Sequence, residues 1–249
     1  MGRAMTTPGS RRPSSLRYRA LGLALATICL GNPGCATGQR ATLAGAFPAP
    51  DRPVAGIATS EYSDERTRDR QGEADRVMDR LGVKPGLRVA DLGAGRGYYT
   101  VRFVRRLGPG AVVYAEDVTP RYLSDLAGRL QKEGIDGVTL VLGDPRNPKL
   151  PPGAVDVALL SHMYHEIENP FEFLYHLHAA LAPGGRVAII DNDKPTRNHG
   201  TPPALLRCEL AAVGYRQVDF LSLEPADGYL AVFVPDTLPA ISEIRACPQ

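Results

Sequence analysis

Cysteine is scarce in this chain, whose 249 residues include only four. Two of them, Cys29 and Cys35, lie near the N-terminus, which leaves Cys208 and Cys247 for the body of the protein. Two cysteines are too few for a network of disulfides or for a zinc site. A single bridge between them remains open if the protein reaches an oxidising compartment.

Acidic residues are missing from the first fifty positions, which contain six of the 29 basic residues. The rest of the chain therefore has 23 basic against 27 acidic side chains, a net charge of −4. The sequence pI of about 8.4 comes largely from the N-terminal segment. Because the body lacks the positive charge that phosphate-binding surfaces carry, we expect no nucleic-acid partner.

Long apolar runs are also missing. Residues 20–30 (ALGLALATICL) are about half of the roughly 20 apolar residues that a membrane span needs, and Gly31-Asn32-Pro33-Gly34 follows them. With the arginines of residues 11–19 in front, this run predicts an export leader over residues 1–35. Cys35 resembles the lipidation site of a bacterial lipoprotein, although Asn32 stands where that pattern has a leucine-like residue. We expect an exported protein with possible membrane attachment through lipidated Cys35, the alternative being a cytoplasmic protein with a basic tail.

The next segments predict a linker and then a helix. Residues 36–60 are rich in alanine, proline and glycine without an apolar period, so we interpret them as a flexible linker. Residues 61–82 are strongly charged and predict an amphipathic helix that ends at Gly82. Its apolar stripe consists of Ala74, Val77, Met78 and Leu81. An alternative function for this helix is a lid that places Arg66 or Arg70 over a substrate.

Strands and helices alternate over residues 83–236, before a C-terminal tail at 237–249. We expect strands at 88–92, 111–115, 138–142, 155–160, 186–190, 217–223 and 229–234. We expect helices after the first glycine turn to residue 107, and at 120–133, 170–181 and 202–213. Continuous apolar strands are typical of a sheet buried on both faces. The predicted fold is therefore α/β, doubly wound and Rossmann-like, with a mostly parallel seven-stranded sheet and helices on both faces.

Polar residues follow the predicted strands, at the edge where doubly wound sheets bind ligands. Asp91 ends the first strand, and Gly93, Gly95 and Gly97 turn the chain into a helix. The ends of the next three strands bring Asp117, Asp144 and Ser161 to the same edge. We expect these residues to line a cofactor site.

A dinucleotide cofactor fits these residues poorly. The third glycine comes one position earlier than in G-x-G-x-x-G, and Tyr98 stands where a small residue belongs. Asp91 would also bring negative charge close to a pyrophosphate. S-adenosylmethionine has no phosphate, and its donor groups match the acids: the ammonium group with Asp91, the ribose hydroxyls with Asp117, and the adenine amine with Asp144.

The segment from about residue 64 to 234 resembles class I S-adenosylmethionine-dependent methyltransferases, of the small type 11 or UbiE-like kind. The motifs that carry the resemblance are residues 89–100 (VADLGAGRGYYT), 114–120 (YAEDVTP), 143–144 (GD), 169–170 (NP) and 181–186 (LAPGGR). The resemblance implies S-adenosylmethionine as cofactor, with Asp117 as the ribose contact and Glu116 as the less favoured choice. Residues 199–203 (HGTPP) and 227–233 (DGYLAVF) resemble a bacterial subgroup, several members of which carry export signals.

A general base is needed only if the acceptor arrives protonated. We predict His165 as this base and Tyr164 as the second choice, acting on a small-molecule acceptor, while a structural role for His165 stays open. His162, His165 and Glu166 on a turn lack the shared helix face of a His-Glu-x-x-His motif, so we expect no metal site.

Two other classes of function remain open. One is an NAD(P)-linked oxidoreductase, which Tyr98 and Asp91 disfavour. The other is a non-catalytic exported module, because S-adenosylmethionine is made inside the cell.

Overall fold

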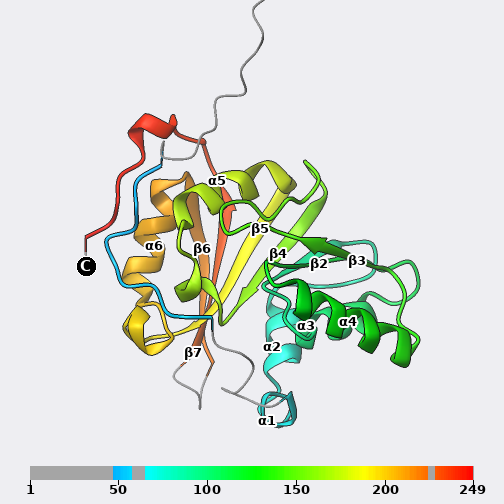
Figure 1. The fold of residues 1–249 in the computed structure, drawn as a ribbon. Helices are drawn as coiled ribbons and strands as arrows, with labels where there is room; N and C mark the ends of the chain where they lie inside the picture. Colours follow the sequence, from blue (N-terminus) through cyan, green and yellow to red (C-terminus); the bar gives the residue numbers. More distant parts are fainter. Residues whose placement is uncertain (1–46, 58–64, 224–227, 249) are drawn as a thin grey trace, which may run out of the picture. The chain divides into compact units, whose positions relative to one another are not determined.

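The computed structural model describes residues 47–57, 65–223 and 228–248. The predicted leader, Cys35 and most of the predicted linker lie outside these residues. Within them, seven strands form one sheet (Figure 1): β1 (Arg88–Leu92), β2 (Val112–Asp117), β3 (Val138–Leu142), β4 (Val155–Ser161), β5 (Leu181–Asn192), β6 (Tyr215–Ser222) and β7 (Gly228–Pro235). The strand order is β3-β2-β1-β4-β5-β7-β6. Only the pairings of β7 with β5 and β6 are antiparallel, so the predicted mostly parallel sheet is confirmed.

The central strands are buried on both faces, as their continuous apolar runs predict. In β1, Ala90 and Leu92 contribute to one hydrophobic cluster, whereas Val89 between them contributes to another. All three side chains are fully buried. Because successive side chains of a strand point to opposite faces, each face of the sheet has its own core.

Helices cover both faces. On one face, α5 (Pro170–Ala180) and α6 (Pro203–Ala212) pack Phe171 and Leu206 into the first cluster. On the other, α3 (Tyr98–Leu107) packs Phe103 into the second cluster. The helix α4 (Pro120–Glu133) buries Leu126 against α3 and β2. Three short 3-10 turns complete the described elements: η1 (Tyr164–Glu166), η2 (Thr196–Asn198) and η3 (Ile241–Glu243).

The predicted helix over residues 61–82 differs in the structure, where two helices occupy its described part. These are α1 (Glu65–Arg70) and α2 (Glu73–Arg80), separated at Gly72. Gly72 has a φ of 63°, a left-handed conformation that interrupts a right-handed helix. The predicted apolar stripe, which runs through α2 to its C-cap Leu81, is buried, whereas α1 has no buried residue.

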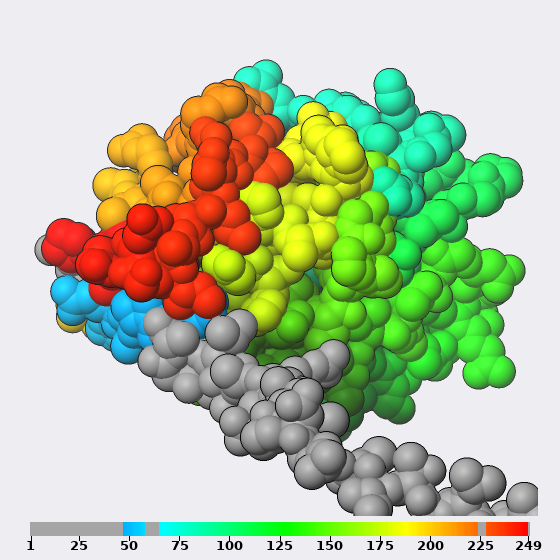
Figure 2. All heavy atoms as spheres, turned by 90° about the horizontal axis from the view of Figure 1, so that it is seen from above, coloured from blue at the N-terminus to red at the C-terminus, as the bar shows by residue number. Residues whose placement is uncertain are grey.

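Residues 47–57 are not the flexible linker that their composition predicts. They pack along α6, beside the C-terminal segment (Figures 1 and 2, blue beside gold and red). Arg52 is 7% exposed and donates from Nε to Glu209 of α6 at 2.9 Å. The amide of Ala55 donates to the carbonyl of His165 at 3.1 Å. We call residues 47–57 the N-terminal strap.

The C-terminal segment is tied to α6 by a disulfide between Cys208 and Cys247. Ile244 and Cys247 are each 2% exposed, so the predicted tail packs onto the domain. None of the helices that the structure describes is both long and apolar enough to cross a membrane.

Candidate cofactor and acceptor site

A cavity of about 880 Å³ opens at the carboxyl ends of the parallel strands. Its walls are the glycine turn after β1, the end of β2 and the η1 turn after β4, with α1, the start of α2 and the N-terminal strap opposite. This is the edge at which the sequence predicts the ligand site, because parallel strands all end there. The volume lies within the range of small-molecule sites.

The glycine turn depends on left-handed backbone. Gly93, Gly95 and Gly97 have φ values of 64°, 54° and 83°. A Cβ atom at Gly97 would overlap the side chain of Leu126, and one at Gly93 would come within 2.9 Å of Met163. Gly93 and Gly95 line the cavity, while Gly97 caps the start of α3 and does not.

Asp117 joins the end of β2 to the glycine turn. Its Oδ2 accepts a hydrogen bond from the amide of Gly95 at 2.9 Å, and its Oδ1 accepts one from the amide of Thr119 at 2.8 Å. The side chain is buried but borders the cavity. Each carboxylate oxygen has two lone pairs, so Asp117 keeps acceptor capacity for a ligand.

Glu116, the less favoured acid in the sequence, also lines the cavity. Its Oε2 is 3.4 Å from the amide of Gly93, whereas its Oε1 is buried without a hydrogen-bond partner. Burial raises the pKa of this carboxyl to about 8, and the neighbouring charges of Asp117 and Asp91 act in the same direction.

Like Gly97, two further predicted cofactor contacts, Asp91 and Asp144, lie outside the cavity lining. Asp91 is 3% exposed and accepts a hydrogen bond from Oγ1 of Thr100 at 2.6 Å, beneath the glycine turn. Burial raises the pKa of Asp91 to about 6. Asp144 accepts from the amide of Arg146 at 3.0 Å and so stabilises its own turn. Their geometry supports a role in holding loops rather than direct contact with a ligand.

Ser161 lines the cavity as predicted, in a cluster that the sequence did not reveal. Arg68 donates to Ser161 Oγ at 2.9 Å and to Glu73 at 2.6 Å, and its guanidinium lies 3.7 Å from the ring centre of Tyr98. Burial would raise the pKa of Glu73, but hydrogen bonding to His162 and the charge of Arg68 outweigh it and lower that pKa. The break between α1 and α2 brings Arg68 into the cavity lining, where the lid alternative placed Arg66 or Arg70.

His165 lines the cavity, and the buried side chain of Asp191 holds its imidazole in place. It is 2% exposed, and its Nδ1 lies 2.9 Å from Oδ1 of Asp191, which is fully buried. Asp191 also accepts a hydrogen bond from Oγ1 of Thr201 at 2.7 Å. This pairing fixes the imidazole and leaves Nε2 as its second functional atom.

Tyr164 faces away from the cavity. Its side chain is fully buried, and its hydroxyl donates to Oε2 of Glu209 at 2.8 Å. Burial, with the nearby charge of Glu209, raises its pKa well above the usual value. Because the hydroxyl is engaged inside the core, the structure does not support the predicted catalytic role of Tyr164.

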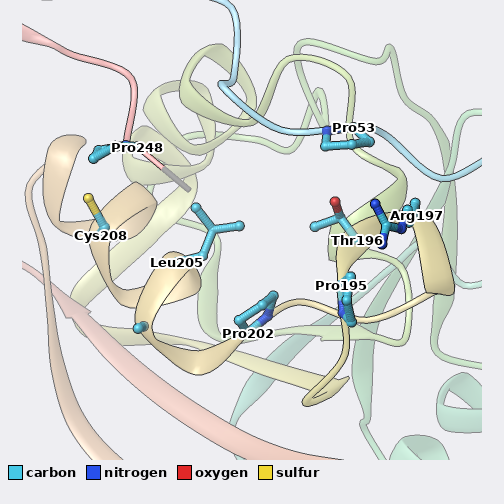
Figure 3. Close-up of a pocket in the computed structure, with 9 residues that line it drawn as sticks. Pro53, Pro195, Thr196, Arg197, Pro202, Leu205, Cys208 and Pro248 are labelled. Atoms are coloured by element: carbon cyan, nitrogen blue, oxygen red, sulfur yellow. The ribbon is translucent and has the colours of Figure 1, made fainter.

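A second hollow of about 390 Å³ lies between the N-terminal strap, η2 and α6 (Figure 3). Its lining is mainly apolar: Pro53, Pro195, Thr196, Arg197, Pro202, Ala204, Leu205, Cys208 and Pro248. None of the predicted site residues borders it, so we place the candidate site in the larger cavity.

Comparisons with known proteins match part of this chain. Residues 90–189 match the family model described as a methyltransferase domain. The chain is 32% identical over 164 residues to trans-aconitate 2-methyltransferase of Mycobacterium tuberculosis, covering 65% of this chain and 59% of that protein. It is 30% identical over 120 residues to the ubiquinone/menaquinone biosynthesis C-methyltransferase UbiE of Vibrio campbellii, covering 48% and 46%. The chain thus matches less than two thirds of the length of these relatives.

Solved structures share the fold. A methyltransferase from Aquifex aeolicus, described as S-adenosylmethionine-dependent, aligns with a TM-score of 0.61 at 20% identity, over 69% of this chain and 98% of that one. The [4+2]-cyclase SpnF aligns with a TM-score of 0.57 at 14% identity, over 76% and 90%. A cyclase on the same fold shows that the fold alone does not determine the reaction. Residues 90–189 thus match a methyltransferase domain, and the chain shares the fold of these solved structures.

Proposed function

We propose that this protein is an S-adenosylmethionine-dependent methyltransferase that acts on a small-molecule acceptor. The observation that carries the proposal is the hydrogen bond from the amide of Gly95 to the carboxylate of Asp117. This bond links the left-handed glycine turn to an acidic side chain, and both line the cavity. This arrangement lies within the matched methyltransferase domain. The cavity volume and the net charge of the body favour a small acceptor over a nucleic acid.

The residues present fit the cofactor. When bound, S-adenosylmethionine would supply a methyl group on a positively charged sulfur. The acceptor atom would take the methyl carbon in line, and the sulfur would leave with the electron pair of the carbon–sulfur bond. Asp117 has lone pairs left for the ribose hydroxyls, and Oε1 of Glu116 is a buried polar atom that needs a partner. The glycine turn keeps Gly93 and Gly95 free of side chains where a ligand approaches the backbone. Asp91 and Asp144 support these loops from outside the cavity.

We further propose that His165 is the general base that removes a proton from the acceptor. With Nδ1–H donating to Asp191, Nε2 carries the lone pair that accepts a proton from a hydroxyl or amine acceptor. Asp191 orients the ring and stabilises the positive charge that forms on it. The relative from Mycobacterium tuberculosis is named for trans-aconitate, a small acid. Arg68 and Lys194 line the cavity of this chain, which is compatible with an acceptor that carries a carboxylate.

The cofactor assignment is tested by the melting temperature of the purified protein. We expect S-adenosylmethionine to raise it by mass action, since a ligand that binds only the folded state stabilises that state. NAD and NADP should leave it unchanged. A shift with NAD or NADP and none with S-adenosylmethionine would support the oxidoreductase alternative instead.

We also propose that the protein is exported, with attachment to a membrane through lipidated Cys35. The leader pattern of residues 1–35 supports export. The disulfide between Cys208 and Cys247 supports it too, because such bridges persist in oxidising compartments. Cell fractionation, with the mass of the processed N-terminus, tests this. Recovery of the full-length chain in the cytoplasm would contradict export, and processing without added lipid mass would contradict lipidation.

A further inference from the structure

Two histidines and a carboxylate meet in the wall of the cavity. His165 and Glu166 belong to η1, and His199 directly follows η2. One ligand atom from each residue lies within 4.8 Å of the other two. Nε2 of His165 is 3.9 Å from Oε1 of Glu166, and the two imidazole rings are 5.4 Å apart. All three residues line the cavity.

Asp191 orients the imidazole of His165 as a metal ligand would need. Because Nδ1 is held by this carboxylate, Nε2 is the nitrogen that remains available, and it is the one near Glu166. A histidine that binds a metal commonly donates its other N–H to a carboxylate, which fixes the ring and raises its basicity. The buried Asp191, bonded also to Thr201, has this geometry.

His199 is held in an uncommon conformation. Its φ is 55°, in the left-handed region that costs free energy for a residue with a side chain. Its amide donates to the carbonyl of Thr196 at 3.1 Å, and its carbonyl accepts from Nδ2 of Asn192 at 3.2 Å. The end of β5 thus keeps His199 in a turn that presents its imidazole to His165.

We propose that His165, Glu166 and His199 bind a divalent transition-metal ion, and that zinc(II) suits this donor set best. Two imidazoles and one carboxylate with an open side are the ligands of catalytic zinc sites. Zinc bonds of about 2.0–2.2 Å would bring the ligand atoms to within about 3.4 Å of one another, so the side chains must rotate inward slightly. The open side faces the cavity.

If the proposed methyltransferase function holds, the metal would also change how the acceptor is activated. A zinc ion bound there would lower the pKa of an acceptor hydroxyl that coordinates it, so the hydroxyl would give its proton to solvent water more readily. Nε2 of His165 would then bind the metal and could not accept a proton. The metal, rather than His165, would activate the acceptor. The acceptor class would be a molecule with an oxygen donor, such as a hydroxy acid.

The test is calorimetric titration of the tag-free full chain with zinc chloride. We expect one ion per chain, with affinity reduced at least tenfold by Glu166→Gln and by His199→Asn, since asparagine tolerates the left-handed backbone. Asp191→Asn should weaken binding about tenfold to a hundredfold. His176→Ala, which changes a histidine of α5 outside the cavity lining, is the matched control and should bind as the unaltered chain does. Circular dichroism checks that each variant is folded.

Failure of the unaltered chain to bind zinc would overturn the proposal, as would binding that Glu166→Gln and His199→Asn leave unchanged. A cobalt(II) complex whose visible absorption disappears in His199→Asn would support it independently. S-adenosylmethionine binding, measured on the same samples, separates the two proposals. Zinc binding without it would contradict the proposed function alone, and the reverse would contradict the metal site alone.

Discussion

At the scale of single residues, Glu116 links the cavity to the pH dependence of folding. Its pKa is raised to about 8 by burial, from an ordinary value of 4.5. The folded state therefore favours the neutral carboxyl, so this contribution to stability is complete below pH 4.5 and is lost as the pH rises toward 8.

We predict that Glu116→Gln removes this loss. Between pH 5 and pH 8 the unaltered chain should lose roughly 2 to 4 kcal/mol more of its free energy of unfolding than the variant loses. Urea unfolding at the two pH values measures the difference. The exposed Glu168→Gln is the control and should follow the unaltered chain, whereas a Glu116→Gln variant with an unchanged pH dependence would show that the raised pKa is wrong.

At the scale of elements, the N-terminal strap holds the turn that carries His165. Arg52 and Glu209 form an ion pair whose side chains are both fully buried. Arg52 also reaches the carbonyls of Tyr164, His165 and Ile167 at 3.4–3.5 Å. We predict that Arg52→Ala destabilises the protein by about 3–5 kcal/mol, because it leaves Glu209 charged and buried without its partner.

Urea unfolding checks this value. Arg105→Ala, which breaks an exposed ion pair with Glu133, is the control and should cost less than about 1 kcal/mol. The double variant Arg52→Met with Glu209→Gln should recover part of the loss, since it removes both charges and keeps a side chain that can accept from Tyr164. Equal costs for Arg52→Ala and Arg105→Ala would mean that the strap does not hold the turn.

The elements also show which features the sequence predicts well. The bounds of β1, β3 and α4 agree with the predicted ranges, because each is an apolar pattern with a clear stop signal. The strap was missed because its partner Glu209 is 157 positions away, and composition carries no information about such pairs. The sequence likewise did not predict His199 as a site residue, because the loop after β5 brings it to the cavity only in the folded chain.

At the scale of the whole molecule, the disulfide closes the C-terminal segment onto α6. Linking Cys208 and Cys247, which are 39 positions apart, limits the freedom of the unfolded chain. We predict that reduction lowers the free energy of unfolding by about 2–4 kcal/mol. Unfolding with and without a reductant measures this, and the double variant Cys208→Ser with Cys247→Ser should not respond to the reductant. An unaltered chain that is equally stable in both conditions would show that the bridge contributes nothing.

The site as a whole follows from the parallel sheet, which gathers loops distant in sequence at one edge. The sequence predicted that edge, the glycine turn, Asp117, Ser161 and His165, since each lies at the end of a strand or within a few residues after it. It could not separate the acids that line the cavity from Asp91 and Asp144, which hold loops. That distinction depends on side-chain direction and on partners such as Thr100.

The measurement that tests the central claim most directly is calorimetric titration of the purified protein with S-adenosylmethionine. We predict binding at one site, weakened by about 1–3 kcal/mol in Asp117→Ala, because a hydrogen bond to a charged acceptor is lost. Asp144→Ala should weaken it much less, since Asp144 does not line the cavity. An unaltered chain that binds no S-adenosylmethionine, or an Asp117→Ala variant that binds it equally well, would contradict the account.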